Sequence, residues 1–381
     1  MKKTRTFLQI ALGVLILMAM SAIIAGAADV SVGMVNVADY VTPGTGEDVY
    51  ESLQAVIDEN PNRTIWFPDG EYIVSKSLCT PADPTKSVDL RLANYAVIKA
   101  ADNFEGEAVV RLGGKDPYNT TVINGSNYSL TGGIIDGNYI ADGVSIDSGR
   151  ETKVQNTSIK HTVVGLHIKY GANSGSSDAD IRDINIIGND TRDAVGMLIE
   201  GYDNTFTNVR IGHIHTGVII KSGGNALTNI HPLCLMNDEI YPGSCGFIDE
   251  NSNNLYTYCY SDQFETCYKI VGNGRNIYTD CFAFWYSGAG KICTGIKSEG
   301  DKFNSVFTNL RIDFRGDTDN TVYDGPLKGS GKFVNLLVDE SDINTNLRYL
   351  NFTDNGIMLK IRTFFEKIKN FFLFIGNMFG L

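Results

Sequence analysis

Apolar and polar residues alternate along this 381-residue chain in short units, and the units recur at a regular spacing. The segment Asn254–Tyr260 reads Asn-Leu-Tyr-Thr-Tyr-Cys-Tyr, and it returns 22 residues later as Asn276–Phe282. Looser copies begin at Asn229 and at Asn208. Alternation with a period of two indicates β-strands. A longer period of about 21–25 residues predicts a solenoid that is built one coil at a time.

Two recurring strands can be aligned from coil to coil. One strand follows Asn or Asp, as after Asn208 and Asn254, and the other mostly follows Gly, as after Gly165 and Gly196. Asn and Gly tolerate left-handed backbone angles, so both residues suit a tight corner between two strands. We expect the Asn side chains to stack and to hydrogen-bond one another along the coil axis.

The start of the chain has the pattern of an export signal. Residues 1–28 combine a basic beginning, an apolar run from Phe7 to Ile24 and the small residues Ala25–Ala27. This pattern predicts a cleaved signal peptide. An uncleaved membrane anchor is the alternative, because the apolar run is long for a signal.

Residues 29–115 predict an N-terminal cap and the first coils. A capping pattern at Asp48 precedes apolar residues at helical spacing, and Asn60 followed by Pro ends that helix. Residues 64–67 and 71–74 then alternate as two strands around a turn. A helix at this end would cover the open edge of the first coil.

The coils are predicted over residues 116–350, and the tail 351–381 predicts an amphipathic helix. The apolar side chains of the tail lie on one helical face, and Lys and Arg residues lie mostly off it. The tail either caps the last coil or lies on a membrane surface as a cationic helix.

Charge excludes one class of partner. The chain carries a formal net charge of −12, and both ends are basic, so the acidic excess lies in the body. Nucleic-acid binding needs a basic face, and we therefore expect no nucleic-acid partner. A polyanionic sugar would need a local basic patch or a bound cation.

The seven Cys residues fit the coil period better than a disulfide framework. Cys245 and Cys267, and likewise Cys259 and Cys281, are 22 residues apart. Each pair is therefore expected on successive coils, about 4.8 Å apart. Free thiols stacked in the interior are the first interpretation, and a disulfide between coils is the alternative.

Alternation predicts which side chains of the Asn-led strand point outward. If the first and third residues after Asn point inward, the second, fourth and sixth point out. Arg210 and Arg311 fall on that outward face, whereas His161 and His213 are expected in the core. The candidate substrate-binding residues are His231, Tyr256, Tyr258, Tyr260, Tyr278, Phe282, Trp285 and Tyr286. Aromatic rings stack on the C–H faces of sugars, so this face predicts a glycan groove, unless a loop or another subunit covers it.

Acidic residues on outward positions give candidates for catalysis. Asp280 and Asp313 share the predicted aromatic face and form the preferred acid pair for a hydrolase. Glu200 and Glu250, at the ends of Gly-led strands, form the second pair. They lie two coils apart, roughly 9–10 Å, at the edge of the range for inverting glycosidases. Lys221 lies between them and would keep both ionised, and a solvated salt-bridge ladder is the alternative there.

The sequence predicts no metal site. No Cys or His spacing suggests zinc, and the acids Asp178, Asp180 and Asp183 do not complete a calcium-loop pattern.

With these features in place, the chain resembles the pectate-lyase-like superfamily of right-handed parallel β-helices over roughly residues 36–350. The resemblance is carried by Leu53–Ile57 with Arg63–Val74, and by Gly132–Gly137. It implies an all-β fold, a single-stranded right-handed parallel β-helix with an N-terminal helix and strand cap. Members include polysaccharide lyases, glycoside hydrolases, fructan transferases and phage tailspikes, several of them trimeric. The catalytic motifs of polygalacturonases do not occur in register, and the calcium cluster of pectate lyases cannot be placed.

The functional hypothesis is an exported carbohydrate-active protein, secreted or at the cell surface, that cleaves a polysaccharide by hydrolysis or β-elimination. For a lyase, Arg210, Arg311 or a Tyr would be the base, with calcium neutralising the uronate; otherwise no cofactor is expected. The alternative is a non-catalytic adhesin or glycan-binding β-helix. The expected partners are a polysaccharide, a membrane surface through the tail, and two further copies in a homotrimer.

Overall fold

The computed structural model describes residues 33–115, 128–170, 175–235, 237–286, 291–314 and 319–339. The chain divides into two units, residues 1–35 and 36–381, and the second unit holds the coils. The signal peptide and the C-terminal helix lie outside the described residues and stay predictions. Within the described ranges, no helix is long and apolar enough to span a membrane.

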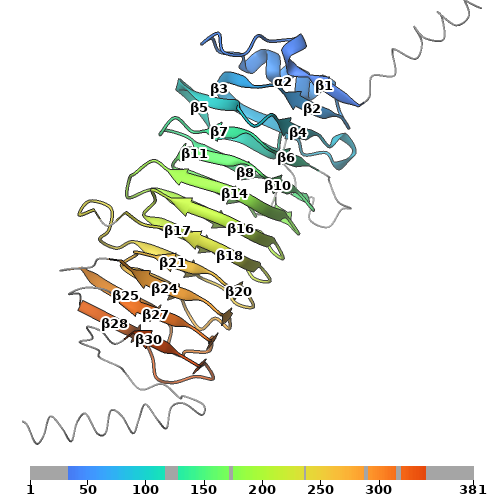
Figure 1. Ribbon diagram of the computed structural model, residues 1–381. Helices are drawn as coiled ribbons and strands as arrows, with labels where there is room; N and C mark the ends of the chain where they lie inside the picture. The colour runs from blue at the N-terminus through green and yellow to red at the C-terminus, as the bar shows by residue number, and fades with distance from the viewer. Residues whose placement is uncertain are drawn as a thin grey trace, which may run out of the picture. The chain divides into compact units, whose positions relative to one another are not determined.

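The second unit is a right-handed parallel β-helix whose coils stack along one axis (Figure 1). Each full coil contributes a strand to three faces, and strands of adjacent coils pair in parallel. We call these faces 1, 2 and 3, in the order in which the chain visits them.

Face 1 precedes the Asn corner. Its strands are β2 (Thr64–Phe67), β4 (Asp89–Leu92), β6 (Ser129–Thr131), β10 (Lys153–Gln155), the first halves of β14 (Asp180–Gly188), β16 (Thr205–Gly212) and β18 (Ala226–Pro232), then β20 (Leu255–Thr257), β23 (Ile277–Thr279), β26 (Val306–Thr308) and β29 (Lys332–Val334).

Face 2 follows that corner. Its strands are the first halves of β3 (Gly70–Pro81) and β5 (Ala96–Lys115), then β7 (Ile134–Asp136), β11 (Ser158–Thr162), the second halves of β14, β16 and β18, and β21 (Tyr260–Asp262), β24 (Phe282–Trp285), β27 (Arg311–Phe314) and β30 (Leu337–Asp339). Strands β21, β24, β27 and β30 form a sheet of their own, joined to the preceding coil by an isolated bridge between Leu233 and Asp262.

Face 3 completes the coil. Its strands are the ends of β3 and β5, then β8 (Asp142–Ile146), β12 (Val164–Ile168), β15 (Val195–Ile199), β17 (Thr216–Ile220), β19 (Cys245–Asp249), β22 (Thr266–Ile270), β25 (Ile292–Ser298) and β28 (Asp319–Asp324). The remaining described elements are β1 (Met34–Asn36), β9 (Gly149–Arg150), β13 (Ser176–Ser177) and the short helices η1 (Val37–Asp39) and η2 (Pro84–Lys86).

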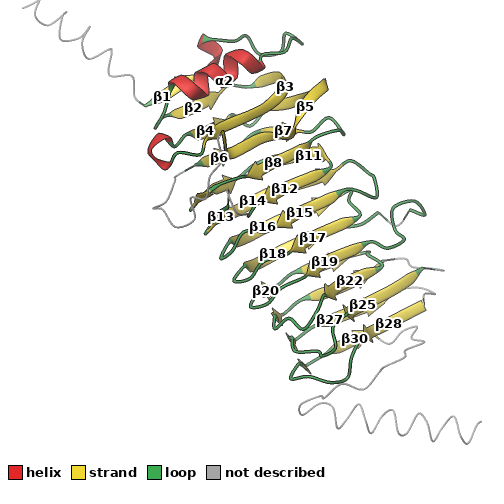
Figure 2. Cartoon of the chain, turned by 180° about the vertical axis from the view of Figure 1, so that it is seen from behind, coloured by secondary structure: helices red, strands yellow, loops and turns green. Residues whose placement is uncertain are grey.

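The predicted cap helix is confirmed. Helix α2 (Tyr50–Glu59) packs on β3 at the end of the stack (Figure 2), and its apolar side chains Leu53, Val56 and Ile57 are buried. The carboxylate of Asp48 accepts hydrogen bonds from the backbone N–H groups of Tyr50 and Ser75, both at 3.0 Å. One side chain therefore starts the helix and ties it to β3.

The corner between faces 1 and 2 depends on residues with positive φ. The φ angle is between 53° and 56° at Asn156, Asp183, Asn208, Asn229, Tyr258, Asp280, Asn309 and Asn335. Most of these are Asn or Asp, which adopt left-handed angles at low cost. Their side chains also bond along the axis: Asn208 Nδ2 donates to Asp183 at 2.7 Å, and Asn309 Nδ2 donates to Asp280 at 2.8 Å. The predicted Asn ladder is confirmed at this corner.

A second Asn ladder was not anticipated. Asn204, Asn225, Asn254 and Asn276 are fully buried where the chain enters face 1. The backbone N–H of each of the first three donates to the side chain of the next Asn, and that of Asn276 donates to Ser305 Oγ. The sequence alignment placed Asn254 and Asn276 at the corner beside Asn208. The strand register instead places them with Asn225, so the corner residues of their coils are Tyr258 and Asp280.

Three aromatic side chains that were predicted to point outward are buried inside the coils. Tyr256 and Tyr278 are each 1% exposed, and their rings stack at 4.3 Å inside the coils. Trp285 is also fully buried, and its Nε1 donates to the carbonyl of Phe264 at 2.7 Å. The prediction that these three point outward was wrong. Asn254 and Asn276 themselves point inward, so Tyr256 and Tyr278, two residues later, point inward as well. Trp285 lies beyond the corner, on β24, where it alternates inward with Ala283.

The cysteine and histidine predictions are confirmed in part. None of the seven Cys residues, all of which lie in the described ranges, forms a disulfide, and Cys259 and Cys281 stack in the core as predicted. Cys245, however, lies beside Thr266 rather than Cys267. The prediction that His161 and His213 lie in the core was wrong, because their side chains are 33% and 44% exposed. Both residues lie at the corner into face 3 with positive φ, and they bond to Asp136 and Asp190.

Removing a stacked ring from the core tests this assignment of faces. We expect Tyr278→Ala to lower the free energy of unfolding by about 3–5 kcal/mol, as for other large-to-small core changes. The matched change Tyr258→Ala, at a side chain 62% exposed, should cost within about 1 kcal/mol. Urea unfolding measures both, and equal losses would contradict the assignment.

A buried carboxylate gives a pH-dependent prediction. Asp249 accepts hydrogen bonds from Tyr256 Oη and Asn254 Nδ2, but burial raises its pKa from 3.8 to about 6. The folded state therefore binds this proton more tightly than the unfolded chain, and the associated stability is lost as pH rises through about 6. We expect the stability of the native chain relative to Asp249→Asn to fall by up to about 3 kcal/mol between pH 4 and pH 7. Parallel stability curves for the two proteins would contradict this.

Candidate functional site

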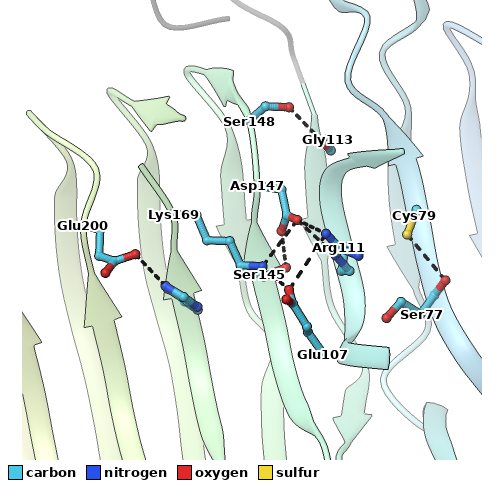
Figure 3. Close-up of polar contacts among 11 residues, drawn as sticks. Ser77, Cys79, Glu107, Arg111, Gly113, Ser145, Asp147, Ser148, Lys169 and Glu200 are labelled. Atoms are coloured by element: carbon cyan, nitrogen blue, oxygen red, sulfur yellow. Dashed lines mark hydrogen bonds and ion pairs between the residues drawn. The ribbon is translucent and has the colours of Figure 1, made fainter. Parts of the chain in front are cut away.

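Charged side chains of both signs gather on the outer side of face 3 (Figure 3), on or just after strands β5, β8, β12, β15 and β17. We call this group the charged cluster. Its members are Glu107, Arg111, Asp147, His167, Lys169, Glu200 and Lys221.

Parallel register brings these residues together from five strands. Arg111 of β5 lies beside Ser145 of β8, which lies beside His167 of β12. Asp147 and Lys169 directly follow the last residues of β8 and β12, as Glu200 and Lys221 follow β15 and β17. Because the carboxyl ends of parallel strands share one edge, adjacent coils hold these side chains about 4.8 Å apart.

Asp147 is the most deeply buried acid of the cluster, at 2% exposure. Arg111 donates to its carboxylate from Nε at 3.0 Å and again from Nη2, and the Ser145 hydroxyl donates to the other oxygen. Lys169 Nζ lies 3.5 Å away and also binds Glu107. A buried carboxylate is tolerated only with such partners, so Asp147 fixes Arg111 and Lys169 in place.

Glu200 links two other members of the charged cluster, His167 and Lys221. Its carboxylate contacts His167 Nε2 at 3.0 Å and Lys221 Nζ at 3.2 Å. Burial alone would raise the pKa of Glu200, but the hydrogen bonds from His167 and Lys221 outweigh it and lower that pKa. The pKa of Glu107 is lowered as well, chiefly by its hydrogen bond from Lys169.

These contacts limit the chemistry that the cluster can perform. Glu107 and Glu200 are held ionised and cannot serve as proton donors near neutral pH. The imidazole of His167, oriented by a carboxylate, can accept a proton. Arg111 and Lys169 can stabilise negative charge that develops beside it.

The donor set does not fit calcium. In the described part of the chain, no three His, Cys, Asp or Glu residues come together in a way that could hold a metal ion. The acids of the charged cluster bind Arg, Lys or His instead. No catalytic step is therefore assigned to a metal here.

Part of the predicted aromatic face is present, but on face 2. Planar groups from five coils form one row, which we call the aromatic stack: Arg210, His231, Tyr260, Phe282 and Arg311. The three rings stack, Arg311 lies over the ring of Phe282, and Arg210 is hydrogen-bonded to His231. Arg210 Nη1 lies 2.9 Å from His231 Nδ1, and the rings of His231, Tyr260 and Phe282 follow at 4.1 and 4.7 Å. Rings stacked on one another expose their edges, so this row offers few open faces for sugars.

The predicted acid pairs are not assembled as expected. Asp280 is a corner residue bonded to Asn309, whereas Asp313 is 1% exposed and lies 3.2 Å from Arg311 on β27. The two acids therefore do not face one open cleft. In the second predicted pair, Glu250 is exposed and lies two coils beyond Glu200. Glu200 itself is bound by His167 and Lys221.

The remaining predicted contacts are split between faces. Tyr258 and Tyr286 do point outward, at 62% and 69% exposure, but Tyr258 sits on the corner before face 2. Asp262, which the sequence did not single out, lies 3.4 Å from His231 at the aromatic stack.

Arg111 and His167 were missed in the sequence. His167 is the second residue after Gly165, so strict alternation in the Gly-led strand would have placed it outward beside Lys169. Arg111 carries no such signal, because β5 is a 20-residue strand whose register with β3 shifts several times.

Comparisons with known proteins agree with this fold. A family model described as Rhamnogalacturonase A/epimerase, pectate lyase-like, matches residues 34–234. That range contains the whole charged cluster and ends before Tyr260, Phe282 and Arg311 of the aromatic stack. A search of the curated proteins gives no match.

Several solved structures resemble the chain. The ORF18 protein of Geobacillus virus E2 has a TM-score of 0.54 and 16% identity, covering 83% of this chain and 64% of that protein. The alginate lyase of Paenibacillus sp. str. FPU-7 has a TM-score of 0.52 and 14% identity, covering 77% and 98%. The exopolygalacturonase of Thermotoga maritima has a TM-score of 0.53 and 11% identity, covering 81% and 92%. The chain thus spans less than two thirds of the virus protein, and identities this low establish the fold alone.

The ion pairs around Glu200 predict a change in its titration. We expect Lys221→Met to raise the pKa of Glu200, because one of the two hydrogen bonds that lower it is removed. Carbon-13 NMR of the Glu200 carboxyl measures this. Lys297→Met, on the same face but paired with Glu299, is the matched control and should leave the Glu200 titration unchanged. An unchanged pKa in Lys221→Met would contradict the assigned contact.

Proposed function

The chain belongs to the rhamnogalacturonase A/epimerase, pectate lyase-like family, and from that premise we propose that it cleaves an acidic polysaccharide by β-elimination at the charged cluster. The observation that carries the proposal is the contact of His167 Nε2 with Glu200 at 3.0 Å, beside cations fixed by the buried Asp147.

A uronate suits the charge of this site. Although the chain as a whole carries −12, the charged cluster balances its three acids with Arg111, Lys169 and Lys221. A sugar carboxylate can therefore approach here with less repulsion than elsewhere on an acidic surface. Arg111 and Lys169, held in position by Asp147, would stabilise the extra negative charge that forms when the neighbouring C–H proton is removed.

His167 is the proposed base. With the proton of its Nε2 held by Glu200, the other ring nitrogen is free to take the proton beside the sugar carboxylate. The electron pair of that C–H bond forms a carbon–carbon double bond, and the glycosidic C–O bond breaks. The leaving oxygen takes a proton from water, and His167 returns its proton to solvent.

Hydrolysis is the less favoured route. It requires a protonated acid and a second carboxylate about 5–10 Å away. Glu107 and Glu200 have lowered pKa values, and Asp280 and Asp313 occupy different environments on face 2 and its corner.

The second candidate is a glycan-binding protein without catalysis. It is favoured by the pairing of the acids in the cluster, since a fully paired ion network also suits a purely structural ladder. Under either function we propose an extracellular location, on the strength of the export pattern in residues 1–28. Assembly as a homotrimer and membrane contact through the tail stay proposals of the same kind.

A panel of acidic polysaccharides tests the function. Alginate, polymannuronate and polygalacturonate should be scored for unsaturated products by ultraviolet absorbance and for new reducing ends. We expect both signals together with one of these polymers, and a loss of about 10²–10⁴-fold in kcat for His167→Gln. New ends without unsaturation would indicate hydrolysis instead.

The matched control is His213→Gln. His213 also pairs with a carboxylate, Asp190 at 2.8 Å, but it lies at a corner and outside the charged cluster. This variant should retain the native rate. If His167→Gln and His213→Gln behave alike while both remain folded, His167 is not the base; binding without any turnover would support the second candidate.

A further inference from the structure

Two tyrosines break the pattern of the turns that follow face 3. At the first position after the face 3 row of Asp147, Lys169, Glu200 and their counterparts, most coils have a small residue or Asn: Ser148, Gly201, Ser222, Asn251, Gly272 and Gly300. At the second position several coils also have such a residue: Gly149, Gly223, Ser252 and Asn273. After Lys169 the chain instead has Tyr170, and two residues after Glu200 it has Tyr202. Both belong to coils that contribute to the charged cluster.

The two rings contact each other but remain open to solvent. Their centroids are 5.0 Å apart at an interplanar angle of 79°, and the residues are 41% and 40% exposed. In an edge-to-face pair, the edge of one ring covers part of the other, and at least one ring face stays uncovered. This differs from the aromatic stack, where ring covers ring.

The backbone holds the pair next to the charged cluster. Tyr170 follows Lys169 directly, and the carbonyl of Lys169 accepts from Ser176 N–H at 3.0 Å. The carbonyl of Tyr202 accepts from Asp178 N–H at 3.1 Å. The Ser176 bond lies within one coil, but the N–H of Lys169 also donates to the carbonyl of Ile146 in the preceding coil at 3.0 Å, and the Asp178 bond joins Tyr202 to the coil before it. The two tyrosines therefore lie just beyond the strand ends that carry Lys169 and Glu200.

We propose that Tyr170 and Tyr202 form a binding site for a sugar ring of the polysaccharide, adjacent to the ring whose carboxylate meets Arg111 and Lys169. The inference rests on the proposed function and adds to it a site for substrate binding that the charged cluster does not supply. Tyrosine suits this role because its ring packs on the apolar C–H face of a pyranose while its hydroxyl hydrogen-bonds to sugar hydroxyls.

A sugar-binding role would explain why the rings of Tyr170 and Tyr202 are exposed beside the charged cluster. An anionic sugar held only by Arg111 and Lys169 would be bound through charge, which is weakened by salt. An uncharged aromatic contact one ring away fixes the position of the chain without that dependence. Tyr170 and Tyr202 are therefore positioning residues, and the structural alternative is that they only brace the two turns against each other.

Kinetics of Tyr170→Ala and Tyr202→Ala on the polymer found active for the native chain test the proposal. We expect KM to rise roughly tenfold in each variant, the loss typical of a truncated aromatic anchor, with kcat within about twofold. Tyr170→Phe should recover most of the affinity because the ring face remains. The matched control is Tyr258→Ala, which removes an exposed tyrosine from a corner far along the chain and should leave KM unchanged.

The outcomes separate this inference from the proposed function. Native KM in both alanine variants, with turnover intact, would overturn the tyrosine site alone. Binding of a polyuronate that depends on the tyrosines, without turnover by the native chain, would refute the lyase and keep the site. Loss of binding together with loss of thermal stability would indicate the bracing role. If the native chain neither binds nor cleaves any acidic polysaccharide of the panel, both proposals fail.

Discussion

Every coil must bond its backbone to the coils above and below it, and this pairing in parallel register is the constraint from which the remaining structure follows. Residues at equivalent positions are brought to about one strand spacing, 4.8 Å. Side chains that cannot stack at that distance would break the pairing. Asn can stack, because its amide both donates and accepts, and the buried row Asn204, Asn225, Asn254 and Asn276 uses this property on successive coils. Planar rings can stack as well, as Tyr256, Tyr278 and Phe307 do in the core.

The same constraint shapes the charged cluster. Like charges one strand spacing apart would repel, so acids and bases alternate from Asp147 through Lys169 and Glu200 to Lys221. A ladder of this kind is ordinarily a surface feature of little energetic weight. Here it is unusual in one respect: Asp147 is buried, and its two cationic partners are immobilised at a position where His167 also lies beside a carboxylate. Fixed cations next to an oriented imidazole are what proton abstraction beside a sugar carboxylate requires.

Features that depend on neighbouring residues in the sequence could be predicted, whereas features that depend on contacts between distant residues could not. The coil period, the cap helix from Tyr50 and the corner at Asn208 and Asn229 were predicted correctly, because each arises from local periodicity or from one residue with a known backbone preference. The direction of Tyr256 and Tyr278 was predicted wrongly, because two Asn ladders with different roles look alike in sequence. At the corner, the coils of Asn254 and Asn276 use Tyr258 and Asp280, and Tyr258 is a residue that no propensity rule would select at a left-handed angle. The pairing of Arg111 with Asp147 spans 36 residues across an irregular strand, so only the three-dimensional register reveals it.

The central claim is that an acidic sugar binds on face 3 at the charged cluster and not on face 2 at the aromatic stack. The most direct measurement is a crystal structure of His167→Gln with an oligosaccharide of the acidic polymer that the native chain cleaves. We predict density for a sugar carboxylate within hydrogen-bonding distance of Arg111 or Lys169. An oligosaccharide bound along His231, Tyr260 and Phe282, with the charged cluster empty, would contradict it.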